Sequence, residues 1–282
     1  MQIITDPLEM QGLSSAWRQH HQRIVLVPTM GYFHDGHISL MEYGRRAGDY
    51  LVVSLFVNPT QFGPHEDLER YPRDLDRDCE LAAKAGVDVI FAPTAAQMYP
   101  NGYQTYVEVT EVTKGLCGTF RPGHFRGVTT VVLKLFNIVQ PHVALFGEKD
   151  YQQLVTIQRM VTDLNLPVQV VGCPLVREAD GLALSSRNVY LTPEERQTAL
   201  KLSRALFRAR DLAAQGVRSR EEIFLSIRPL LADDPLLSLE YLALIDPQTL
   251  TEVTTIARQA RLAVAAWVGQ TRLIDNILLE VP

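Results

Sequence analysis

Short apolar segments alternate with longer stretches of helical spacing through the first part of the chain. Strand-length runs rich in Val, Ile, Leu and Phe occupy residues 23–29, 50–58, 87–93, 142–148 and 168–174. Between them, the spacing predicts helices over residues 36–47, 71–86, 129–140 and 151–164. Near-continuous apolar strands that alternate with helices are typical of βαβ units. The pattern predicts an α/β fold with a Rossmann-like, doubly wound parallel sheet, whose ligands bind beyond the carboxyl ends of the strands.

The pattern changes after about Pro174. The segment "YLTPEERQ" predicts a helix start, because Thr192 can cap it, Pro193 suits its first position and Glu195 completes a capping box. This helix should run to about Gln215, and "REEIFLSIRPLLA" predicts another. Shorter strands are expected near residues 239–245, 261–268 and 272–279. We therefore predict two domains: residues 1–174 form the Rossmann-like domain, and residues 175–282 form a smaller α+β domain that closes over a site in the cleft.

The composition argues against several kinds of partner and site. With 46% hydrophobic residues, 21% charged residues and a net charge of −5, the chain has no bulk attraction to nucleic acid or to an anionic membrane. Cys79, Cys117 and Cys173 are widely spaced and form no CxxC motif, so neither a disulfide framework nor a zinc site is expected. The N-terminus lacks the features of a signal peptide, and no apolar run approaches the roughly 20 residues of a membrane span. We expect a cytoplasmic protein.

The first predicted strand leads into "VPTMGYFHDGHISL", which holds the main candidate chemistry. Gly31 and Gly36 allow tight turns, and the helix start beyond them offers unpaired N–H groups and a partial positive charge that suit phosphate. His34 and His37 could add donors to the same phosphates. An isolated pair of this kind is more often a turn residue and a helix residue, each with a local hydrogen bond. Its place after the first strand of such a sheet favours the phosphate site.

Two later stretches offer cationic groups. Ser185, Ser186 and Arg187 form a polar loop just before the capped helix, and their hydroxyls and guanidinium suit a migrating pyrophosphate. Taken alone, "SSR" is more typical of a solvated loop between domains. Lys149, in "FGEKDYQQL", follows the strand over residues 142–148, where the fold places ligands. A surface turn is the commoner interpretation of that segment without its context.

Two further stretches leave more than one interpretation open. In "SLFVNPTQFGPHEDLERYPRD", Gln61 could present an amide donor and acceptor to a polar substrate, although a glutamine in such a place is more often a loop residue. In "CGTFRPGHFRGV", we expect Arg121, His124 and Arg126 in an irregular loop among glycines. That loop is either a mobile cover or a basic turn, and the sequence does not assign roles to its side chains.

The HxGH pattern of "HDGH" resembles the signature of the nucleotidyltransferase superfamily and of class I aminoacyl-tRNA synthetases, and "SSR" resembles their mobile KMSKS-type loop. Read together and in order, "PTMGYFHDGH", "FVNPTQFGPHEDLERYPR", "FRPGHFRGV", "FGEKDYQQL" and "READGLALSSRN" resemble the pantoate–β-alanine ligase family. The resemblance is dense from residue 24 to about residue 192. It implies that pantoate and ATP first give a pantoyl adenylate and pyrophosphate. β-Alanine then attacks the adenylate, which releases pantothenate and AMP.

The resemblance also implies roles for individual residues. His37 is the family's proposed proton donor toward the phosphates, and Gln61 and Gln153 should flank pantoate, with Gln61 also in the path of β-alanine. The catalytic set implied is His34, His37, Lys149, Ser185, Ser186 and Arg187. The residues expected to bind ATP are Met30, Gly31, Tyr32, Phe33, His34, Asp35, Gly36, His37, Gly147, Glu148, Lys149, Asp150, Val176, Leu184, Ser185, Ser186 and Arg187.

Two positions depart from the family pattern. Leu184 stands where methionine is usual, and its similar volume should preserve packing. Arg77 lies between Asp76 and Asp78, where some members carry another acid, so we assign no protein ligand to Mg²⁺. The Mg²⁺ that accompanies ATP is then expected on phosphates and water. No tightly bound organic cofactor is expected, and the family implies a homodimer.

Two other functions compete with the ligase. One is a nucleotidyltransferase that moves a nucleotidyl group onto a phosphate acceptor; the other is a nucleotide-binding regulator that has lost catalysis. Gln61 and Gln153, together with the lack of a dense basic acceptor pocket, favour the ligase over the transferase. The presence of His34, His37 and Lys149 argues against the regulator.

Overall fold

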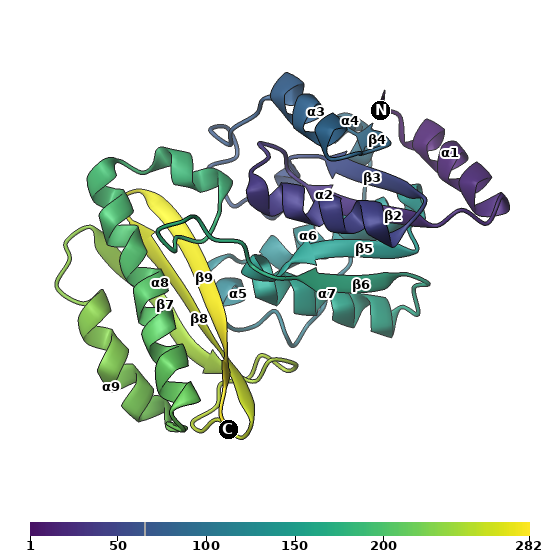
Figure 1. Ribbon diagram of the computed structural model, residues 1–282. Helices are drawn as coiled ribbons and strands as arrows, with labels where there is room; N and C mark the ends of the chain where they lie inside the picture. Colours follow the sequence, from purple (N-terminus) through teal and green to yellow (C-terminus); the bar gives the residue numbers. More distant parts are fainter. Residues whose placement is uncertain (65) are drawn as a thin grey trace. The chain divides into compact units, whose positions relative to one another are not determined.

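The computed structural model describes residues 1–64 and 66–282, so His65 of the "FGPHEDLER" motif lies outside the described residues (Figure 1). The chain divides into two compact units. Unit 1 comprises Met1–Thr113, Gly118–Glu148 and Gln153–Pro174, and unit 2 comprises Lys114–Cys117, Lys149–Gln152 and Leu175–Pro282. Two short segments from the first part of the chain are thus built into unit 2.

Unit 1 contains a parallel sheet of six strands in the order β1-β4-β3-β2-β5-β6. In this order the strands are β1 (Gln2–Ile4), β4 (Val89–Phe91), β3 (Tyr50–Leu55), β2 (Ile24–Thr29), β5 (Val143–Gly147) and β6 (Gln169–Cys173). From β2 the chain winds outward through β3 and β4, and then returns to place β5 on the other side of β2. The switch point between β2 and β5 is where such folds bind ligands, and the predicted Rossmann-like fold is confirmed.

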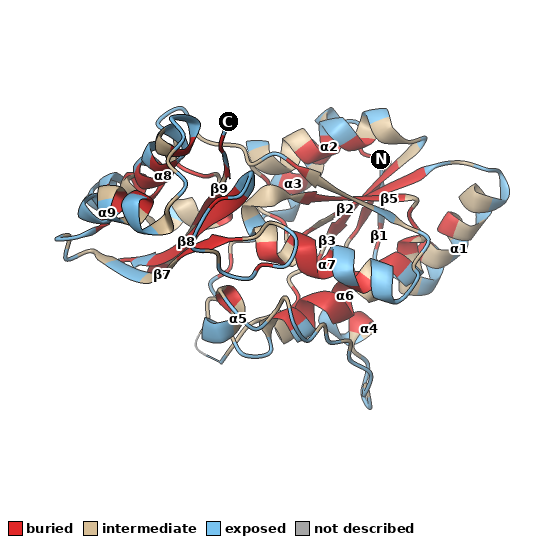
Figure 2. Ribbon diagram, turned by 90° about the horizontal axis from the view of Figure 1, so that it is seen from below, coloured by how far each residue is buried: buried red, intermediate tan, exposed pale blue. Residues whose placement is uncertain are grey.

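Helices cover both faces of this sheet (Figures 1 and 2). On one face lie α2 (Asp35–Ala47) and α3 (Leu75–Lys84), and on the other lie α1 (Pro7–Gln19), α6 (His124–Val139) and α7 (Tyr151–Asp163). The side chains of Ile24, Val25, Leu26 and Val27 are all fully buried. This two-sided burial is why β2 has a continuous apolar sequence rather than an alternating one.

Several element boundaries differ from the prediction. No element was predicted before residue 23, where β1 and α1 lie. The helix predicted from residue 71 begins at Leu75, after Asp74 caps it. The helix predicted from residue 129 begins at His124, because Gly123 takes a left-handed conformation (φ 81°) that starts it early. His124 and Arg126 therefore lie in the first turn of a helix, and their placement in an irregular loop was wrong. Short helices α4 (Ala95–Met98) and α5 (Cys117–Phe120) complete this region.

Unit 2 is built from two helices and an antiparallel sheet. Its elements are α8 (Pro193–Ala214), α9 (Arg220–Leu231), β7 (Leu237–Ile245), β8 (Gln259–Val268) and β9 (Thr271–Glu280). Apolar side chains of α8 and α9, such as Leu206 and Ile223, pack with Leu262 and Val264 of β8 in one core. The predicted smaller α+β part is therefore confirmed.

The predicted capping box at the start of α8 is present. Thr192 Oγ1 accepts the backbone N–H of Glu195 at 3.2 Å, and the backbone N–H of Thr192 donates to Glu195 Oε2 at 2.8 Å. Pro193 occupies the first turn, where its missing N–H costs nothing. The cap therefore fixes where the chain enters the longest helix of unit 2.

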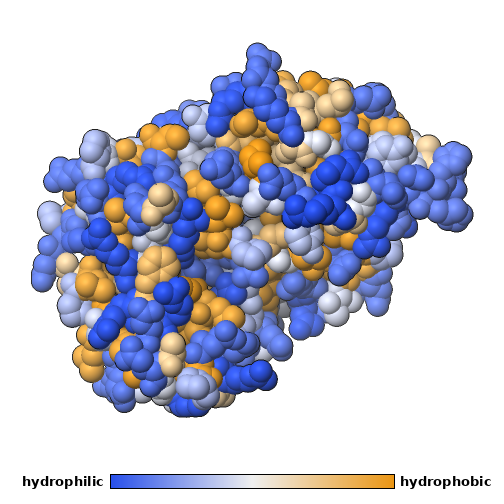
Figure 3. Space-filling model, in the orientation of Figure 1, coloured by the Kyte–Doolittle hydropathy of each residue, from blue (hydrophilic) through white to orange (hydrophobic). Residues whose placement is uncertain are grey.

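On the face of the molecule seen in Figure 3, hydrophilic and apolar side chains are interspersed. Single exposed apolar residues such as Leu8 and Leu225 are ordinary on a protein surface. Within the described part of the chain, no helix combines the length and the apolar character needed to cross a membrane.

Replacing Thr192 by alanine should lower the free energy of unfolding by about 1 kcal/mol, because the N–H of Glu195 loses its acceptor. Denaturant titration of the variant and the wild type measures this difference. The exposed Thr254→Ala serves as the control and should stay within about 0.5 kcal/mol of the wild type. Equal effects of the two substitutions would contradict a role for the cap.

Candidate active site

The turn after β2 carries the first group of candidate residues. Gly31 (φ 90°) and Tyr32 (φ 53°) both adopt left-handed backbone conformations, which reverse the chain before α2. Thr29 Oγ1 donates to the carbonyl of Ser54 at 2.7 Å and so ties the end of β2 to β3. The turn therefore delivers the N-terminus of α2 to the carboxyl edge of the sheet.

His34 and His37 form an unusual capping box at this N-terminus. His34 Nδ1 accepts the backbone N–H of Gly36 at 3.2 Å, and His37 Nδ1 accepts the backbone N–H of His34 at 3.3 Å. A ring nitrogen that accepts an N–H carries no proton, so the proton of each neutral imidazole is on Nε2. Both rings are half-buried, and their centroids lie 4.1 Å apart. Local hydrogen bonding, which the sequence also allowed as a purely structural interpretation, thus orients both rings as N–H donors.

The carboxylate of Asp78, on α3, binds the backbone of the same turn. Its Oδ2 accepts the N–H of Tyr32 at 2.6 Å, its Oδ1 accepts the N–H of Phe33 at 2.7 Å, and the side chain is 1% exposed. Burial raises the pKa of Asp78, although the two N–H groups act in the opposite direction. A Cβ on Gly31 would lie 3.0 Å from Asp78 Oδ2, so glycine leaves room for the carboxylate. The sequence suggested Asp78 only in connection with Mg²⁺, and its contact with this turn was not predicted.

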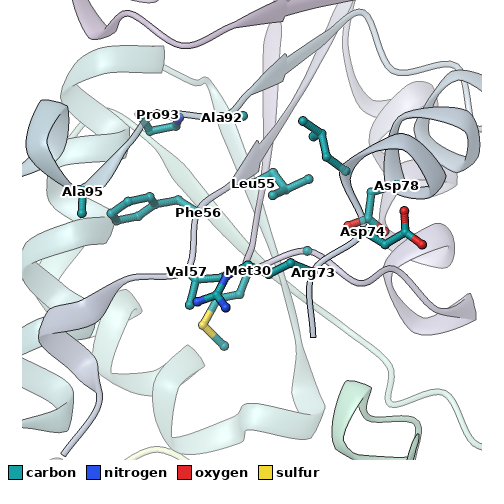
Figure 4. A pocket seen from close by; sticks show the side chains of 12 residues that line it. Met30, Leu55, Phe56, Val57, Arg73, Asp74, Asp78, Ala92, Pro93 and Ala95 are labelled. Carbon is teal, nitrogen blue, oxygen red and sulfur yellow. The ribbon is translucent and has the colours of Figure 1, made fainter. Parts of the chain in front are cut away.

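A pocket of about 310 Å³ opens beside the turn, at the carboxyl ends of β2, β3 and β4 (Figure 4). Asp74 and Asp78 lie on one side of it, and the apolar side chains of Phe56 and Pro93 lie on the other. Its size is at the lower end for sites of small organic ligands. The lining residues are Met30, Gly31, Leu55, Phe56, Val57, Arg73, Asp74, Leu75, Asp78, Ala92, Pro93 and Ala95.

Gln61 ends the 3-10 turn η1 (Pro59–Gln61) and is tied to the turn after β2. Its Nε2 donates to Met30 Sδ at 3.4 Å, and its Oε1 accepts from Asn58 Nδ2 at 3.0 Å. Asn58 is 1% exposed and also donates to the carbonyl of Gly127 at 3.2 Å. The side chain of Gln61 is therefore held in place beside the turn by these hydrogen bonds.

Arg121 and His124, whose roles were left open, both hold the backbone of Gln61. Its carbonyl is 2.9 Å from His124 Nδ1 and 3.4 Å from Arg121 Nη2. Arg121 Nη1 lies 3.2 Å from His124 Nε2. Because a guanidinium only donates and a carbonyl only accepts, His124 must carry its proton on Nδ1. Arg126 takes no part in this contact, since its guanidinium lies over the ring of Tyr106, 4.1 Å from the centroid.

Glu66 completes this arrangement. Its Oε1 accepts from Arg121 Nε at 2.7 Å, and the pair is mostly shielded from solvent. Burial by itself would raise the pKa of Glu66, but the hydrogen bond and charge of Arg121 outweigh it, and the pKa is lowered. Gly127 allows the close packing of α6 on η1, because a Cβ there would come within 2.4 Å of the carbonyl of Thr60. The position of Gln61 thus depends on the first turn of α6.

Unit 2 holds a second group of predicted residues. Lys149, in the turn η2 (Glu148–Asp150), has its Nζ 3.8 Å from Asp150 Oδ2. The backbone N–H of Leu184 donates to the carbonyl of Val176 at 3.1 Å. Ser185 then caps η3 (Ser186–Tyr190) by accepting the N–H of Arg187 at 3.2 Å. The structure therefore joins Val176 to the loop that carries the predicted phosphate ligands.

The predicted residues divide between the units. Unit 1 contains Met30, Gly31, Tyr32, Phe33, His34, Asp35, Gly36, His37, Gln61, Gly147, Glu148 and Gln153, and unit 2 contains Lys149, Asp150, Val176, Leu184, Ser185, Ser186 and Arg187. Gln152 is buried and bonded to residues 115 and 117, whereas its neighbour Gln153 is half-buried. Among the described residues, no group of three or more His, Cys, Asp or Glu side chains could hold a metal ion.

Comparison with known proteins decides the family. The family model described as pantoate-beta-alanine ligase matches residues 2–278. The chain belongs to the pantoate–β-alanine ligase family. It is 57% identical to the pantothenate synthetase of Syntrophus aciditrophicus over 98% of this chain and 96% of that one. The pantothenate synthetase of Heliobacterium modesticaldum is 55% identical over the whole of both chains.

Solved structures agree with this assignment. The crystal structure of pantothenate synthetase from Thermus thermophilus has a TM-score of 0.93 and 48% identity, covering 98% of this chain and 99% of that one. The ligase from Francisella tularensis, solved in complex with beta-gamma ATP and β-alanine, has a TM-score of 0.82 and 34% identity, over 99% and 97% of the two chains. The chain is therefore an enzyme, a ligase that condenses pantoate with β-alanine in an ATP-dependent reaction, as the sequence predicted. Transfer of a nucleotidyl group to a phosphate acceptor is not favoured.

Replacing Asp78 by asparagine should lower stability by about 1–3 kcal/mol and reduce turnover, because an NH2 group takes the place of one acceptor oxygen and cannot accept the N–H that this oxygen bound. Denaturant titration and the rate of pantothenate formation measure the two effects. Asp76→Asn, at an exposed position of the same helix, is the matched control. If the two variants behave alike, the carboxylate of Asp78 does not hold the turn.

The ion pair of Glu66 with Arg121 should stabilise the protein only above acidic pH. Because the pKa of Glu66 is lowered in the folded state, its contribution is complete above the unfolded value of about 4.3 and is lost as the pH falls through the folded value. Glu66→Gln should therefore cost about 1 kcal/mol at pH 7, and this cost should shrink as the pH falls below about 4. Unfolding titrations across this range, with the exposed Glu69→Gln as control, check the difference. A cost independent of pH would contradict this account.

Proposed function

We propose that the condensation proceeds through a pantoyl adenylate. A carboxylate oxygen of pantoate attacks the α-phosphorus of ATP, and the bond to the bridging oxygen breaks to release pyrophosphate. The amino nitrogen of β-alanine then attacks the acyl carbon, loses a proton and expels AMP. Positioning and charge stabilisation carry such a reaction, and no covalent bond to the protein is needed.

The capping box of His34 and His37 is the observation that supports this proposal most. Each ring accepts a backbone N–H at Nδ1, so each neutral ring carries its proton on Nε2 and presents an N–H donor there. The helix N-terminus adds a partial positive charge. In our proposal both rings contact the phosphates, and His37 donates a proton toward them as negative charge develops.

The substrate acids are proposed to bind beside this turn. Gln61 flanks pantoate and lies in the path of β-alanine, and Gln153 flanks pantoate. The hydrogen bond from Gln61 to Met30 supports this assignment, because it ties the amide to the turn that should bind ATP. Arg121 and His124 hold the backbone of Gln61, so its side chain starts from a fixed point and can orient a carboxylate.

The remaining predicted residues, which belong to unit 2 except for Gly147 and Glu148, are proposed to stabilise the phosphates and the nucleoside. Lys149, Ser185, Ser186 and Arg187 take the phosphates, with Leu184 and Glu148 in the same lining. The backbone of Val176 contacts adenine, and Gly147 and Asp150 lie nearer the ribose. The hydrogen bond from the N–H of Arg187 to Ser185 Oγ supports this assignment, because it orders the loop that should bind the phosphates.

Three features complete the proposal. Mg²⁺ neutralises charge on the phosphates when bound, and we assign it to phosphate oxygens and water. The protein acts as a homodimer, as its family implies. We place it in the cytoplasm, and the free thiols of Cys79, Cys117 and Cys173 support a reducing compartment.

Product analysis tests the reaction itself. Purified protein with ATP, Mg²⁺, pantoate and β-alanine should form pantothenate, AMP and pyrophosphate, which mass spectrometry detects. With pantoate but without β-alanine, labelled pyrophosphate should exchange into ATP, because the adenylate forms reversibly. Formation of ADP, or exchange that does not need pantoate, would overturn the adenylate.

His37→Gln should lower pantoate-dependent pyrophosphate exchange by roughly 10²–10⁴-fold, the scale of lost proton donation and charge stabilisation. Glutamine is a usual capping-box residue at this position and can still accept the N–H of His34, so the variant should unfold like the wild type. His37→Ala loses both functions and should be less stable and equally slow. Near-normal exchange in His37→Gln would remove the ring from the chemistry.

A further inference from the structure

Asp275 and Asn276 are adjacent polar residues in the middle of β9, and they are only 4% and 6% exposed. Neighbouring residues of a strand point to opposite faces of the sheet. Leu273 and Leu279, which share the face of Asp275, pack in the core that α8 and α9 cover. Asp275 thus places a carboxylate on the apolar, helix-covered side, and Asn276 points to the other side.

Asp275 binds Arg177 through both carboxylate oxygens. Arg177 Nη1 donates to Oδ2 at 2.6 Å and Nη2 donates to Oδ1 at 2.8 Å. The guanidinium also lies 4.9 Å from the ring centroid of Phe207 on α8. A buried ion pair is often no more stabilising than a well-packed apolar pair, so folding alone does not account for a charge at this position.

Arg177 belongs to the hairpin that precedes the predicted phosphate loop. It forms a bridge with Ala183, and its Nη1 donates to the carbonyl of Gly181 at 3.0 Å. Ser185 and Arg187 follow directly after this hairpin. The contact with Asp275 therefore fixes the base from which that loop extends.

Asn276 holds the Lys149 turn on the opposite face of the sheet. Its Nδ2 donates to the carbonyl of Lys149 at 2.9 Å, and its Oδ1 accepts from Arg261 Nη1 at 2.6 Å. The guanidinium of Arg261 lies 3.6 Å from the ring centroid of Tyr151, whose hydroxyl donates to the carbonyl of Pro247 at 3.0 Å. These contacts explain why Lys149–Gln152 packs as part of unit 2.

We propose that Asp275 and Asn276 are positioning residues for catalysis. One on each side of β9, they hold the two phosphate-binding segments of unit 2, the loop that ends in Arg187 and the turn that carries Lys149, in one fixed arrangement. This inference rests on the proposed function, in which both segments bind the phosphates. Asp275 and Asn276 themselves need not touch any substrate.

Asn276→Asp is the most direct test, because it keeps an oxygen for Arg261 and removes the N–H that binds the carbonyl of Lys149. Pantoate-dependent pyrophosphate exchange should fall by about 10²-fold in kcat, the scale of a misplaced catalytic group. The KM for pantoate should not change, because its proposed ligands belong to unit 1. A purely structural role would lower the unfolding midpoint and leave exchange at 25 °C unaltered, which would overturn the proposal.

Thr198→Val is the matched control for stability. It removes a partly buried hydrogen bond within unit 2, from Thr198 Oγ1 to Asp234 Oδ2 at 2.9 Å, without touching either phosphate-binding segment. It should lower the unfolding midpoint and leave exchange unaffected. If Thr198→Val slows exchange as much as Asn276→Asp does, the effect reflects loosening of unit 2, and the positioning role is overturned.

A double-mutant cycle with Lys149→Met separates this inference from the proposed function. If Asn276 acts through Lys149, Asn276→Asp should slow exchange little further in the Lys149→Met background. The positioning role alone would be overturned if the two substitutions reduced the exchange rate additively. It would also be overturned if Lys149→Met slowed exchange while Asn276→Asp exchanged at the wild-type rate. Full activity of Lys149→Met would instead overturn the assignment of Lys149 on which the inference rests.

The paired substitution Arg177→Met with Asp275→Leu tests the other side of β9. Replacing both charges by apolar side chains avoids leaving one buried and unpaired, so the protein should fold. We expect exchange to fall by about 10–100-fold with an unfolding midpoint close to that of the wild type. Unchanged exchange in the folded double variant would overturn the role of Asp275.

Discussion

One buried carboxylate fixes the turn on which the candidate site of unit 1 depends. After β2 the chain reverses through the left-handed residues Gly31 and Tyr32 before α2 begins, and Asp78 accepts the N–H groups of Tyr32 and of Phe33, the next residue. Such groups are costly to bury without partners. With both satisfied, His34 can cap the helix, and the imidazoles take orientations set by the backbone rather than by a ligand.

Much of the fold could be predicted because its signals are local and repeated. Each buried parallel strand has a continuous apolar sequence, and the cap of α8 depends on residues within one turn of each other. The turn with His34 and His37 was predicted for the same reason, since glycines and a helix start follow a strand directly. β1 and α1 were missed, because a strand of three residues and a helix with few buried side chains leave a weak periodic signal.

The remaining parts of the site arise from contacts that spacing does not encode. Asp78 and Tyr32 are 46 residues apart, and Arg121 reaches the carbonyl of Gln61 across 60 residues. Each of these side chains holds backbone, so its neighbours in sequence give no sign of its partner. The start of α6 was misplaced because Gly123 was taken as a mark of a loop, whereas its left-handed conformation starts the helix.

The assignment of Lys149–Gln152 to unit 2 has a consequence for dissection of the protein. The chain enters unit 2 twice before residue 175, and Gln152 joins those entries by bonding to Gly115 and Cys117. A fragment that begins at residue 175 would therefore lack both of these segments, which are hydrogen-bonded to each other. The face of the sheet that carries Asn276 would lose their cover. During synthesis, residues 175–282 cannot complete unit 2 by themselves, because unit 2 also includes two segments that left the ribosome earlier. The two units are distinct in packing but are not separable pieces of polypeptide.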